Sequence, residues 1–270
     1  MPDQGIDFGS YRVLGMPIRA VDYEAAVNEI VTAAMEGVPL SVSALAVHGV
    51  MTGVLDLEQR YRLNRLAMLV PDGQPVRWAL RWLHGIKLPD RVYGPNLMLR
   101  CCEAAAQREL PVYLYGSTPK TLTALANNLT QMFPRLAIAG SMSSKFRQLT
   151  DQEQAEVCET IKASGARMTF VGLGCPRQEV WAFENADSLR MPVLAVGAAF
   201  DFHAGKLAQA PRFLQDRGLE WAYRLYNEPR RLWRRYLYLN PLFLWNLGLQ
   251  RLGIKDYSDE SCPENKLRYG

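Results

Sequence analysis

The sequence predicts an α/β protein in which a parallel sheet is covered by helices on both faces and is followed by a helical appendage. Short apolar runs alternate with amphipathic stretches of about 10 to 15 residues, the pattern of parallel strands joined by crossover helices. Glycines and polar residues directly follow several of these runs, where the strands of such a sheet open onto a ligand crevice. Beyond Pro211 the chain becomes aromatic and arginine-rich, and the strand pattern stops.

The predicted elements begin with a short strand or hairpin over residues 11–18. Asp22 is a suitable N-cap for a helix over 23–36, because Ala26, Ile30 and Ala33 fall on one stripe of that helix. The alternation continues with these expected elements: strand 40–47, helix to residue 64, strand 67–70, helix 76–84, helix 96–108, strand 112–115, helix 119–133, strand 136–139, helix 151–164, strand 168–171, a helix from residue 178, and strand 193–196. Right-handed crossovers place the loops after these strands on one rim of the sheet.

The composition is that of a folded globular protein. Its 270 residues are enough for one large domain plus an appendage, and 49% of them are apolar while 21% are charged. We expect an α/β domain over residues 1–210, a basic aromatic helical appendage over 211–255, and a disordered tail over 256–270. A net charge of +4 does not by itself indicate nucleic-acid binding.

The cysteines and the hydropathy pattern predict the cellular location of the protein. The five cysteines form neither a CxxC pair nor an even disulfide set, and the N-terminus carries no hydrophobic signal segment. No run reaches the roughly 18 apolar residues of a spanning helix. We therefore expect a cytoplasmic protein that does not cross a membrane but can lie on one. No pair of His, Asp or Glu residues has metal-ligand spacing, so no metal site is expected.

Asp72 and Arg91 are the first candidate site residues. Asp72 follows the apolar run 67–70 within Pro71-Asp-Gly73, a position that suits a general base facing the crevice. The alternative is a turn aspartate or a helix N-cap, because Pro-Asp-Gly is common turn chemistry. Arg91 precedes the helix predicted from residue 96 and can bind phosphate with two hydrogen bonds, although a solvent-exposed arginine is the alternative.

Three strand-end loops contain further candidates. After strand 112–115, Ser117 or Thr118 can cap the next helix, which is the favoured interpretation, while free N–H groups at that helix terminus can also hold phosphate. The stretch 171–179 reads VGLGCPRQE, and its glycines allow a ligand close to the backbone. Gln178 can hydrogen-bond a sugar or a base, whereas Glu179 can equally serve the helix dipole. Asp201, after the last strand, can accept hydrogen bonds from ribose hydroxyls or from a base edge. We interpret the nearby His203 as a packing histidine.

The appendage combines arginines with aromatic residues. Its stretch 236–250 carries no charge, but Asn240, Pro241 and Asn246 interrupt it, so we do not expect it to span a membrane. Arginines beside tryptophans and a short apolar stretch favour an interfacial helix on an anionic membrane. One alternative is a helix that packs its aromatic residues into the core. The other is a nucleic-acid-binding patch, for which the sequence contains no motif.

Taken in order, several motifs resemble the WecG/TagA/CpsF family of bacterial glycosyltransferases (glycosyltransferase family 26) over roughly residues 11–250. These motifs are Pro71-Asp-Gly73, Arg91-Val-Tyr-Gly94, Tyr115-Gly-Ser117, Gly172-Leu-Gly-Cys-Pro-Arg-Gln-Glu179, Phe200-Asp-Phe-His-Ala-Gly205, Ala210-Pro211, Gly218-Leu-Glu-Trp-Ala-Tyr-Arg224 and Glu228-Pro-Arg230. Because so many motifs occur in the same order, the match is far more specific than any one of them.

The resemblance implies an inverting transferase that moves a sugar from a UDP-sugar to a sugar on undecaprenyl diphosphate at the cytoplasmic face of the membrane. The sugars transferred in the family are N-acetylmannosamine, its uronic acid, or a hexose such as glucose. The products are teichoic-acid linkage units, enterobacterial common antigen or exopolysaccharide repeats. The resemblance also implies a Rossmann-like fold, no cofactor, no catalytic metal, and a C-terminal appendage that contacts the membrane. It leaves homo-oligomer formation open.

Carried over by position, the resemblance implies that Asp72 is the catalytic base, that Arg91 lies near the leaving diphosphate, and that Gln178 is a site glutamine. It implies that the lipid diphosphate is bound by Arg224, Arg230 and Arg231 of the appendage. The donor is expected to contact these residues at the strand ends: Gly116, Ser117, Gly172, Gly174, Pro176 and Asp201.

One motif departs from the family pattern. Many relatives carry Thr-x-Asn near the end of the early strand, where this chain has Ala44-Leu-Ala46. Ser43 and His48 lie close by in the sequence and are expected to take its place at the acceptor. The departure bears on the identity of the donor or acceptor sugar more than on the reaction class.

Two other functions fit parts of the sequence. A nicotinamide-dependent oxidoreductase can use a similar sheet, but here no GxGxxG motif follows the first strand with an acidic residue about 20 positions later. A non-catalytic adaptor in a polysaccharide assembly complex would use the basic appendage alone.

Overall fold

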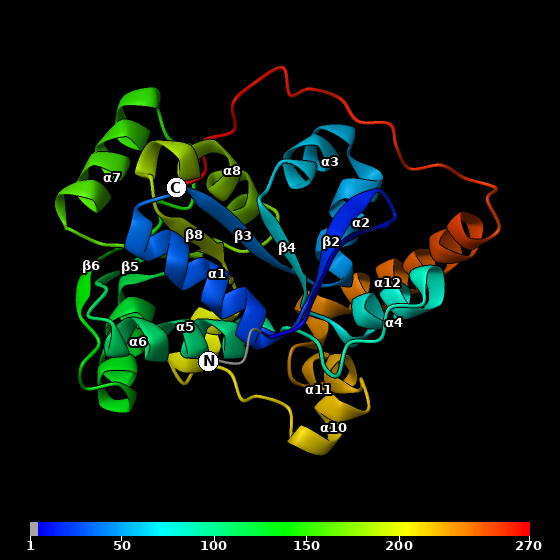
Figure 1. Ribbon diagram of the computed structural model, residues 1–270, viewed down its shortest axis with the longest axis horizontal. Helices are drawn as coiled ribbons and strands as arrows, with labels where there is room; N and C mark the ends of the chain where they lie inside the picture. The colour runs from blue at the N-terminus through cyan, green and yellow to red at the C-terminus, as the bar shows by residue number, and fades with distance from the viewer. Residues whose placement is uncertain (1–4) are drawn as a thin grey trace.

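An eight-stranded sheet runs through the molecule with the strand order β1-β2-β4-β3-β8-β7-β5-β6 (Figure 1). The computed structural model describes residues 5–270, apart from the side chains of Arg212, Asp216, Arg231 and Arg235. Neighbouring strands are parallel except β1 and β2, which form an antiparallel hairpin at one edge. Helices flank the sheet, so the predicted fold class is confirmed.

The strands are short, and the central ones are buried, as expected for a sheet that is covered on both faces. Their bounds are Asp7–Val13 (β1), Met16–Val21 (β2), Leu40–Leu45 (β3), Met68–Pro71 (β4), Val112–Gly116 (β5), Ile138–Met142 (β6), Met168–Gly172 (β7) and Pro192–Ala195 (β8).

Helices connect the strands and then form the C-terminal appendage. Their bounds are Tyr23–Glu36 (α1), Val47–Leu55 (α2), Leu57–Asn64 (α3), Gln74–His84 (α4), Gly94–Gln107 (α5), Pro119–Met132 (α6), Asp151–Ala163 (α7), Arg177–Leu189 (α8), Ala199–His203 (α9), Arg212–Asp216 (α10), Glu220–Asn227 (α11) and Pro229–Arg251 (α12).

Two hydrophobic cores lie on opposite faces of the sheet because successive strand residues point to opposite sides. One core joins the strand residues Leu45, Leu69 and Val171 to α2, α3, α7 and α8. The other joins Val42 and Leu114, with further strand residues, to α1, α5, α6 and α9. The apolar runs seen in the sequence therefore serve both faces at once.

The structure differs from the predicted elements at a few boundaries. The helix expected up to residue 64 is two helices, because the Asp56 side chain accepts hydrogen bonds from the N–H groups of Glu58 and Gln59 and starts α3. Strand β6 lies at 138–142 rather than 136–139, where it pairs with β5. Helix α5 begins at Gly94, two residues earlier than expected, with Pro95 in its first turn.

We call helices α10, α11 and α12 the appendage; α10 and α11 lie at the bottom of Figure 1 and α12 lies at the right, beside α4. Phe243 and Leu247 of α12 are buried in the first core, and Gln250 accepts a hydrogen bond from the N–H of Leu14. The outer residues of the same helix are exposed, among them Leu237, with 60% of its surface accessible. Within residues 5–270, no helix is long and apolar enough to cross a membrane.

The segment 256–270 follows an extended path along the body of the protein, drawn red in Figure 1. The buried Arg60 side chain donates hydrogen bonds to the carbonyl groups of Tyr257 and Asp259, at 3.2 and 2.7 Å. At the far end, the Leu149 N–H donates to the carbonyl of Arg268, and Tyr269 bridges to Gln148. The segment therefore makes defined contacts where the sequence predicts a disordered tail. The sequence does not reveal these contacts, because their partners lie about 100 to 200 residues upstream.

Candidate active site

A cavity of about 370 Å³ opens at the carboxyl ends of β3, β4, β7 and β8, between the sheet and the appendage. β3 has β4 on one side and β8 on the other, so the strand order reverses there, and parallel sheets bind ligands at such a point. The volume is typical of a small-molecule site. The cavity has one wall from the sheet loops and another from α11 and α12.

Asp72 lies on the sheet wall of this cavity. It follows Pro71, the last residue of β4, and its Oδ1 accepts a hydrogen bond of 3.1 Å from the N–H of Gly94 at the start of α5. Burial raises the pKa of Asp72 to about 6, with Arg91 opposing the rise and Glu220 adding to it. A carboxylate with such a pKa is well suited to accept a proton near neutral pH.

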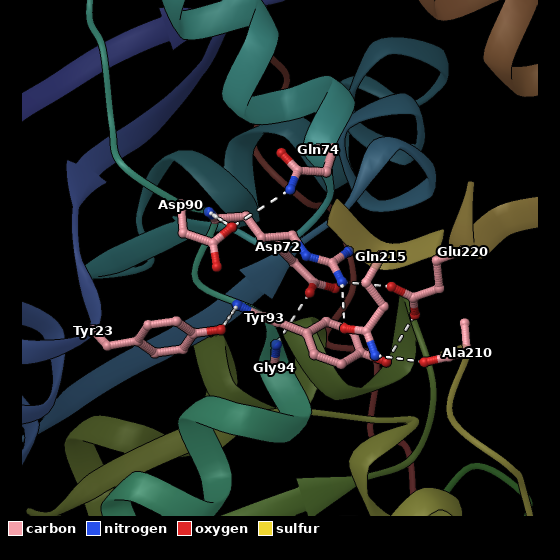
Figure 2. Close-up of polar contacts among 10 residues, drawn as sticks. Tyr23, Asp72, Gln74, Asp90, Tyr93, Gly94, Ala210, Gln215 and Glu220 are labelled. Carbon is pink, nitrogen blue, oxygen red and sulfur yellow. Dashed lines mark hydrogen bonds and ion pairs between the residues drawn. The ribbon is translucent and has the colours of Figure 1, made fainter. Parts of the chain in front are cut away.

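Arg91 is held in a buried polar network that links the two walls, and Figure 2 labels its partners Tyr93, Gln215 and Glu220. Its Nη2 lies 2.5 Å from Oε2 of Glu220 on α11 and 3.3 Å from Oε1 of Gln215. The Tyr93 hydroxyl donates to the other Glu220 oxygen at 2.8 Å, and burial together with the nearby Glu220 charge raises the pKa of Tyr93. The network fixes the Arg91 guanidinium beside Asp72 and ties α11 to the sheet wall.

Arg224 adds a second cation to the cavity from the appendage. It is four residues after Glu220 on α11, so both side chains fall on one face of this helix. The guanidinium carbon lies 5.5 Å from the ring centroid of Phe202. Burial opposes its charge, but the surrounding groups, Tyr236, Tyr93, Glu220 and Asp72, raise the pKa of Arg224 above its usual value. Two arginines, Arg91 and Arg224, therefore reach the cavity, which is also lined by the carboxyl groups of Asp72 and Glu220.

Gln178 and Glu179 form a buried pair at the start of α8. Oε1 of Glu179 accepts hydrogen bonds from Ser43 Oγ at 3.0 Å and from Gln178 Nε2 at 2.9 Å, and burial raises the pKa of Glu179. Oε1 of Gln178 has no hydrogen-bond partner within the described part of the chain, and both residues line the cavity. The pair presents acceptor atoms that suit the hydroxyl or N–H groups of a ligand.

The glycines at the strand ends occupy their positions for different physical reasons. Gly116 has a φ of 111°, and a Cβ there would lie 2.8 Å from the backbone of Gly172. A Cβ on Gly172 would in turn lie 2.5 Å from the Phe200 ring. These two positions are therefore explained by packing alone. Gly174, with a φ of 79°, faces open space and lines the cavity, so a ligand can approach its backbone.

The sequence profile of the glycosyl transferase WecG/TagA/CpsF family matches residues 11–257. The chain belongs to this family. A curated relative in Bacillus spizizenii, named N-acetylglucosaminyldiphosphoundecaprenol N-acetyl-beta-D-mannosaminyltransferase, is 31% identical over 176 residues. The aligned region covers 65% of this chain and 66% of the relative, so the chain spans just under two thirds of the relative's length. The family resemblance seen in the sequence is thus confirmed.

The structure brings together most of the residues that the family motifs suggested. The predicted residues that line the cavity are His48, Asp72, Arg91, Ser117, Gly172, Gly174, Gln178, Asp201 and Arg224. Four others do not line it: Ser43 is fully buried behind Glu179, Gly116 and Pro176 lie outside the lining, and Arg230 is exposed in the first turn of α12. The prediction for Arg231 falls on a side chain outside the described ones.

Several residues of this site were not singled out from the sequence. Glu220, Tyr93 and Gln215 form the network around Arg91, and Trp221 and Tyr236 line the cavity from the appendage. Glu220 and Tyr93 do occur inside the family motifs, and the four-residue spacing of Glu220 and Arg224 is a usable signal. The contact of Glu220 with Arg91 spans 129 positions and is visible only in the fold.

Among the described residues, no group of three or more His, Cys, Asp or Glu side chains lies close enough together to hold a metal ion. His203 is a packing histidine, as expected from the sequence: it is buried, and its Nε2 lies 2.9 Å from the carbonyl of Pro95.

Proposed function

We propose that this protein is an inverting glycosyltransferase that moves a sugar from a UDP-sugar to a sugar carried on undecaprenyl diphosphate. The observation that carries the proposal is Asp72, a carboxylate with a pKa near 6 that shares a cavity with Arg91 and Arg224. This arrangement supplies a base for an acceptor hydroxyl and cations for a departing diphosphate. Membership of the glycosyl transferase family supports the same reaction class.

In the proposed reaction, Asp72 takes the proton of the acceptor hydroxyl as its oxygen attacks the anomeric carbon of the donor. The new glycosidic bond forms on the face opposite to UDP, and the bond between the anomeric carbon and the diphosphate oxygen breaks. UDP leaves with the electron pair of that bond, and the proton on Asp72 passes to solvent. The donor configuration is inverted because only one displacement takes place.

The negative charge of the leaving diphosphate needs a counterpart in the site. Arg91 is already oriented by Glu220 and Tyr93, and Arg224 reaches the cavity from the appendage. Preorganised cations of this kind stabilise a developing charge in a transition state. Ser117 lines the cavity just before α6, so the positive end of the dipole of this helix favours a second phosphate contact there; Pro119 has no N–H, and the N–H of Thr121 donates to Thr118 Oγ1.

The relative's name suggests the first substrates to test. It names an N-acetylglucosamine linked through a diphosphate to undecaprenol as the acceptor and an N-acetylmannosamine residue as the transferred group. We propose an acceptor of this class for the present chain, in the assembly of a bacterial surface polymer. The donor sugar is less well defined, because Ala44 and Ala46, at the place of the family's Thr-x-Asn, line the cavity with methyl groups.

The test is UDP release from a panel of UDP-sugars with a short-chain polyprenyl-diphosphate-linked N-acetylglucosamine, comparing the wild type with Asp72→Asn. We expect acceptor-dependent turnover with one donor, a fall of about a thousandfold or more in the variant, and unchanged UDP binding. Asp187→Asn, an exposed carboxylate on α8, is the matched control and should keep full activity. Turnover should also fall as the pH drops through about 6, because protonated Asp72 cannot act as a base.

Full turnover in Asp72→Asn would remove Asp72 from the role of base. No UDP binding by the wild type would contradict the proposed reaction class. Binding of NAD would favour an oxidoreductase, and lipid binding without any effect of UDP-sugars or of Asp72 would favour a non-catalytic adaptor.

A further inference from the structure

The tryptophans of this protein are distributed unevenly. Of the six, Trp181 is fully buried, while the other five are between 37% and 67% exposed. The five exposed ones all lie on three helices: Trp78 and Trp82 on α4, Trp221 on α11, and Trp233 and Trp245 on α12. Helices α11 and α12 belong to the appendage, but α4 belongs to the Rossmann-like domain. Large aromatic side chains gathered on one part of a surface indicate a binding face.

Helix α4 has an apolar inner face and an outer face that carries tryptophan and arginine. Val76, Ala79 and Leu80 are buried against the sheet. Trp78, 48% exposed, and Trp82, 52% exposed, face outward with Arg81 between them at the spacing of one helix face. An outward face with two tryptophans and an arginine is far from the usual polar surface of a helix on a globular domain.

Helices α4 and α12 lie beside one another (Figure 1). Their last turns meet at one backbone carbonyl: the His84 Nε2 atom lies 2.8 Å from the carbonyl oxygen of Arg12, and Gln250 Nε2 donates to the same oxygen at 3.1 Å. The outward residues of α12 are also large and apolar, being between 60% and 67% exposed: Leu237, Tyr238, Leu244 and Trp245.

The charge of the two helices has a single sign. Helix α4 carries two arginines and α12 carries five, and neither helix contains an aspartate or a glutamate. Of the arginines with described side chains, Arg81, Arg230, Arg234 and Arg251 are exposed. The Arg234 guanidinium carbon lies 5.5 Å from the Trp233 ring centroid. Tryptophan and arginine together are typical of the interface between water and an anionic bilayer.

We propose that α4 completes a membrane-contacting surface with α12, so that the Rossmann-like domain itself rests on an anionic bilayer. We call this the α4–α12 surface, made of Trp78, Arg81 and Trp82 of α4 and Arg234, Leu237, Tyr238, Leu244 and Trp245 of α12. A second protein with an acidic surface would match its charge, but tryptophan side chains beside exposed leucines on convex helices suit lipid headgroups and acyl chains better.

The α4–α12 surface adjoins the mouth of the cavity. A Cβ on Gly218 would lie 2.7 Å from Cη2 of Trp78, and both Gly218 and Trp221 line the cavity. A lipid-linked acceptor held in the bilayer would therefore reach Asp72 from the side of α4 and α11. This link to the acceptor rests on the proposed function, whereas contact with the bilayer does not.

The test is co-sedimentation of the purified full-length protein with vesicles, which needs neither donor nor turnover. Vesicles of phosphatidylglycerol and phosphatidylcholine are compared with vesicles of phosphatidylcholine alone, and wild type is compared with Trp82→Ala and Arg81→Glu. We expect the wild type to prefer the anionic vesicles, Arg81→Glu to bind them about tenfold more weakly, and Trp82→Ala about fivefold more weakly.

Matched controls come from the far side of the molecule. Arg135→Glu makes the same charge change at a residue that is 71% exposed, and Met132→Ala removes another exposed apolar side chain. Both should bind vesicles like the wild type. Equal weakening by Arg135→Glu, or unchanged binding by both α4 variants, would overturn the proposal. Self-association of the wild type that Trp82→Ala abolishes, without vesicle binding, would assign the surface to a second copy of the chain instead.

A non-binding wild type would also overturn the proposal while leaving the transferase reaction intact. Conversely, vesicle binding that depends on α4 in a protein with no UDP-sugar turnover would support the surface and contradict the proposed function. The two ideas therefore fail separately.

Discussion

The two walls of the cavity are held in place by different forces. On the sheet wall, Asp72 follows β4, which pairs with strands on both sides, and Gln178 is 5% exposed at the start of α8. On the appendage wall, α11 is joined to the sheet by Glu220, which bonds Arg91 and Tyr93. Backbone ladders fix the first wall, whereas a few side-chain contacts fix the second.

This difference predicts that the two walls have different roles, one in the chemical step and the other in binding the acceptor. Groups that must be positioned for the chemical step, such as Asp72, lie on the rigid wall. The appendage wall carries Trp221 and Tyr236, whose rings lie 6.0 Å apart, and it borders the exposed aromatic surface. We therefore expect changes on the sheet wall to lower kcat and changes of the aromatic residues on the appendage wall to raise the KM of the acceptor.

Among the changes that test this comparison of the two walls, Arg91→Ala has the largest expected effect, because Arg91 contacts both walls. We expect kcat to fall by about 10²- to 10³-fold, since a preorganised cation beside the leaving group is lost. The change also leaves Glu220, which is 8% exposed, without its cation, so the free energy of unfolding should fall by about 3 kcal/mol. Steady-state kinetics and urea unfolding measure both effects.

The control for Arg91→Ala is Arg135→Ala, which removes an exposed ion pair with Glu109, whose N–O distance is 3.5 Å. It should change the free energy of unfolding by less than about 0.5 kcal/mol. A loss of stability in Arg91→Ala no larger than in this control would show that the buried pair does not join the two walls.

A smaller effect is expected for Glu220→Gln. Glutamine keeps a hydrogen bond to Tyr93 but carries no charge, so we expect kcat to fall by about tenfold. The Glu220 charge contributes to the raised pKa of Asp72, so its removal should lower that pKa. The acidic limb of the profile of kcat/KM against pH should then move to lower pH, which a merely structural role would not cause. An unmoved limb would contradict the electrostatic link between the two walls.

Trp221→Ala tests the appendage wall alone. We expect the acceptor KM to rise by about tenfold, with kcat changed by less than about threefold, because the ring lines the cavity but supplies no base or cation for the chemical step. Tyr226→Ala is the matched control on the same helix: this ring is 86% exposed and does not line the cavity. A fall in kcat with an unchanged KM would contradict the proposal that the aromatic residues of the appendage wall serve acceptor binding.

The smallest expected effect is a gain of stability in Asp72→Asn. A carboxyl whose pKa is higher in the folded than in the unfolded protein destabilises the fold once the pH exceeds the unfolded value of 3.8, and the full cost is reached above about 6. Asparagine removes this cost, so the free energy of unfolding should rise by about 1–3 kcal/mol at pH 7.5 and by less at pH 5. Urea unfolding at the two pH values measures it, and an equal gain at both would contradict the raised pKa.

Local patterns in the sequence were enough to predict the fold class and much of the residue set that lines the cavity. Strand-end motifs placed Asp72, Gly174, Gln178 and Asp201 at one rim, because all parallel strands of a sheet present their carboxyl ends together. They failed for Ser43, whose side chain points into the core toward Glu179. A period of two along a strand does not tell which face of a fully buried strand meets the ligand.

The sequence by itself determined the alternation of helices and strands, the loops that reach the rim, and the basic aromatic nature of the appendage. Each of these depends on residues close together in the chain. Only the tertiary structure decided that Glu220 pairs with Arg91, that Arg60 holds residues 257 and 259, and that α4 lies beside α12. Such contacts join side chains that are distant in sequence, and they form only because the packing of the whole molecule brings them together.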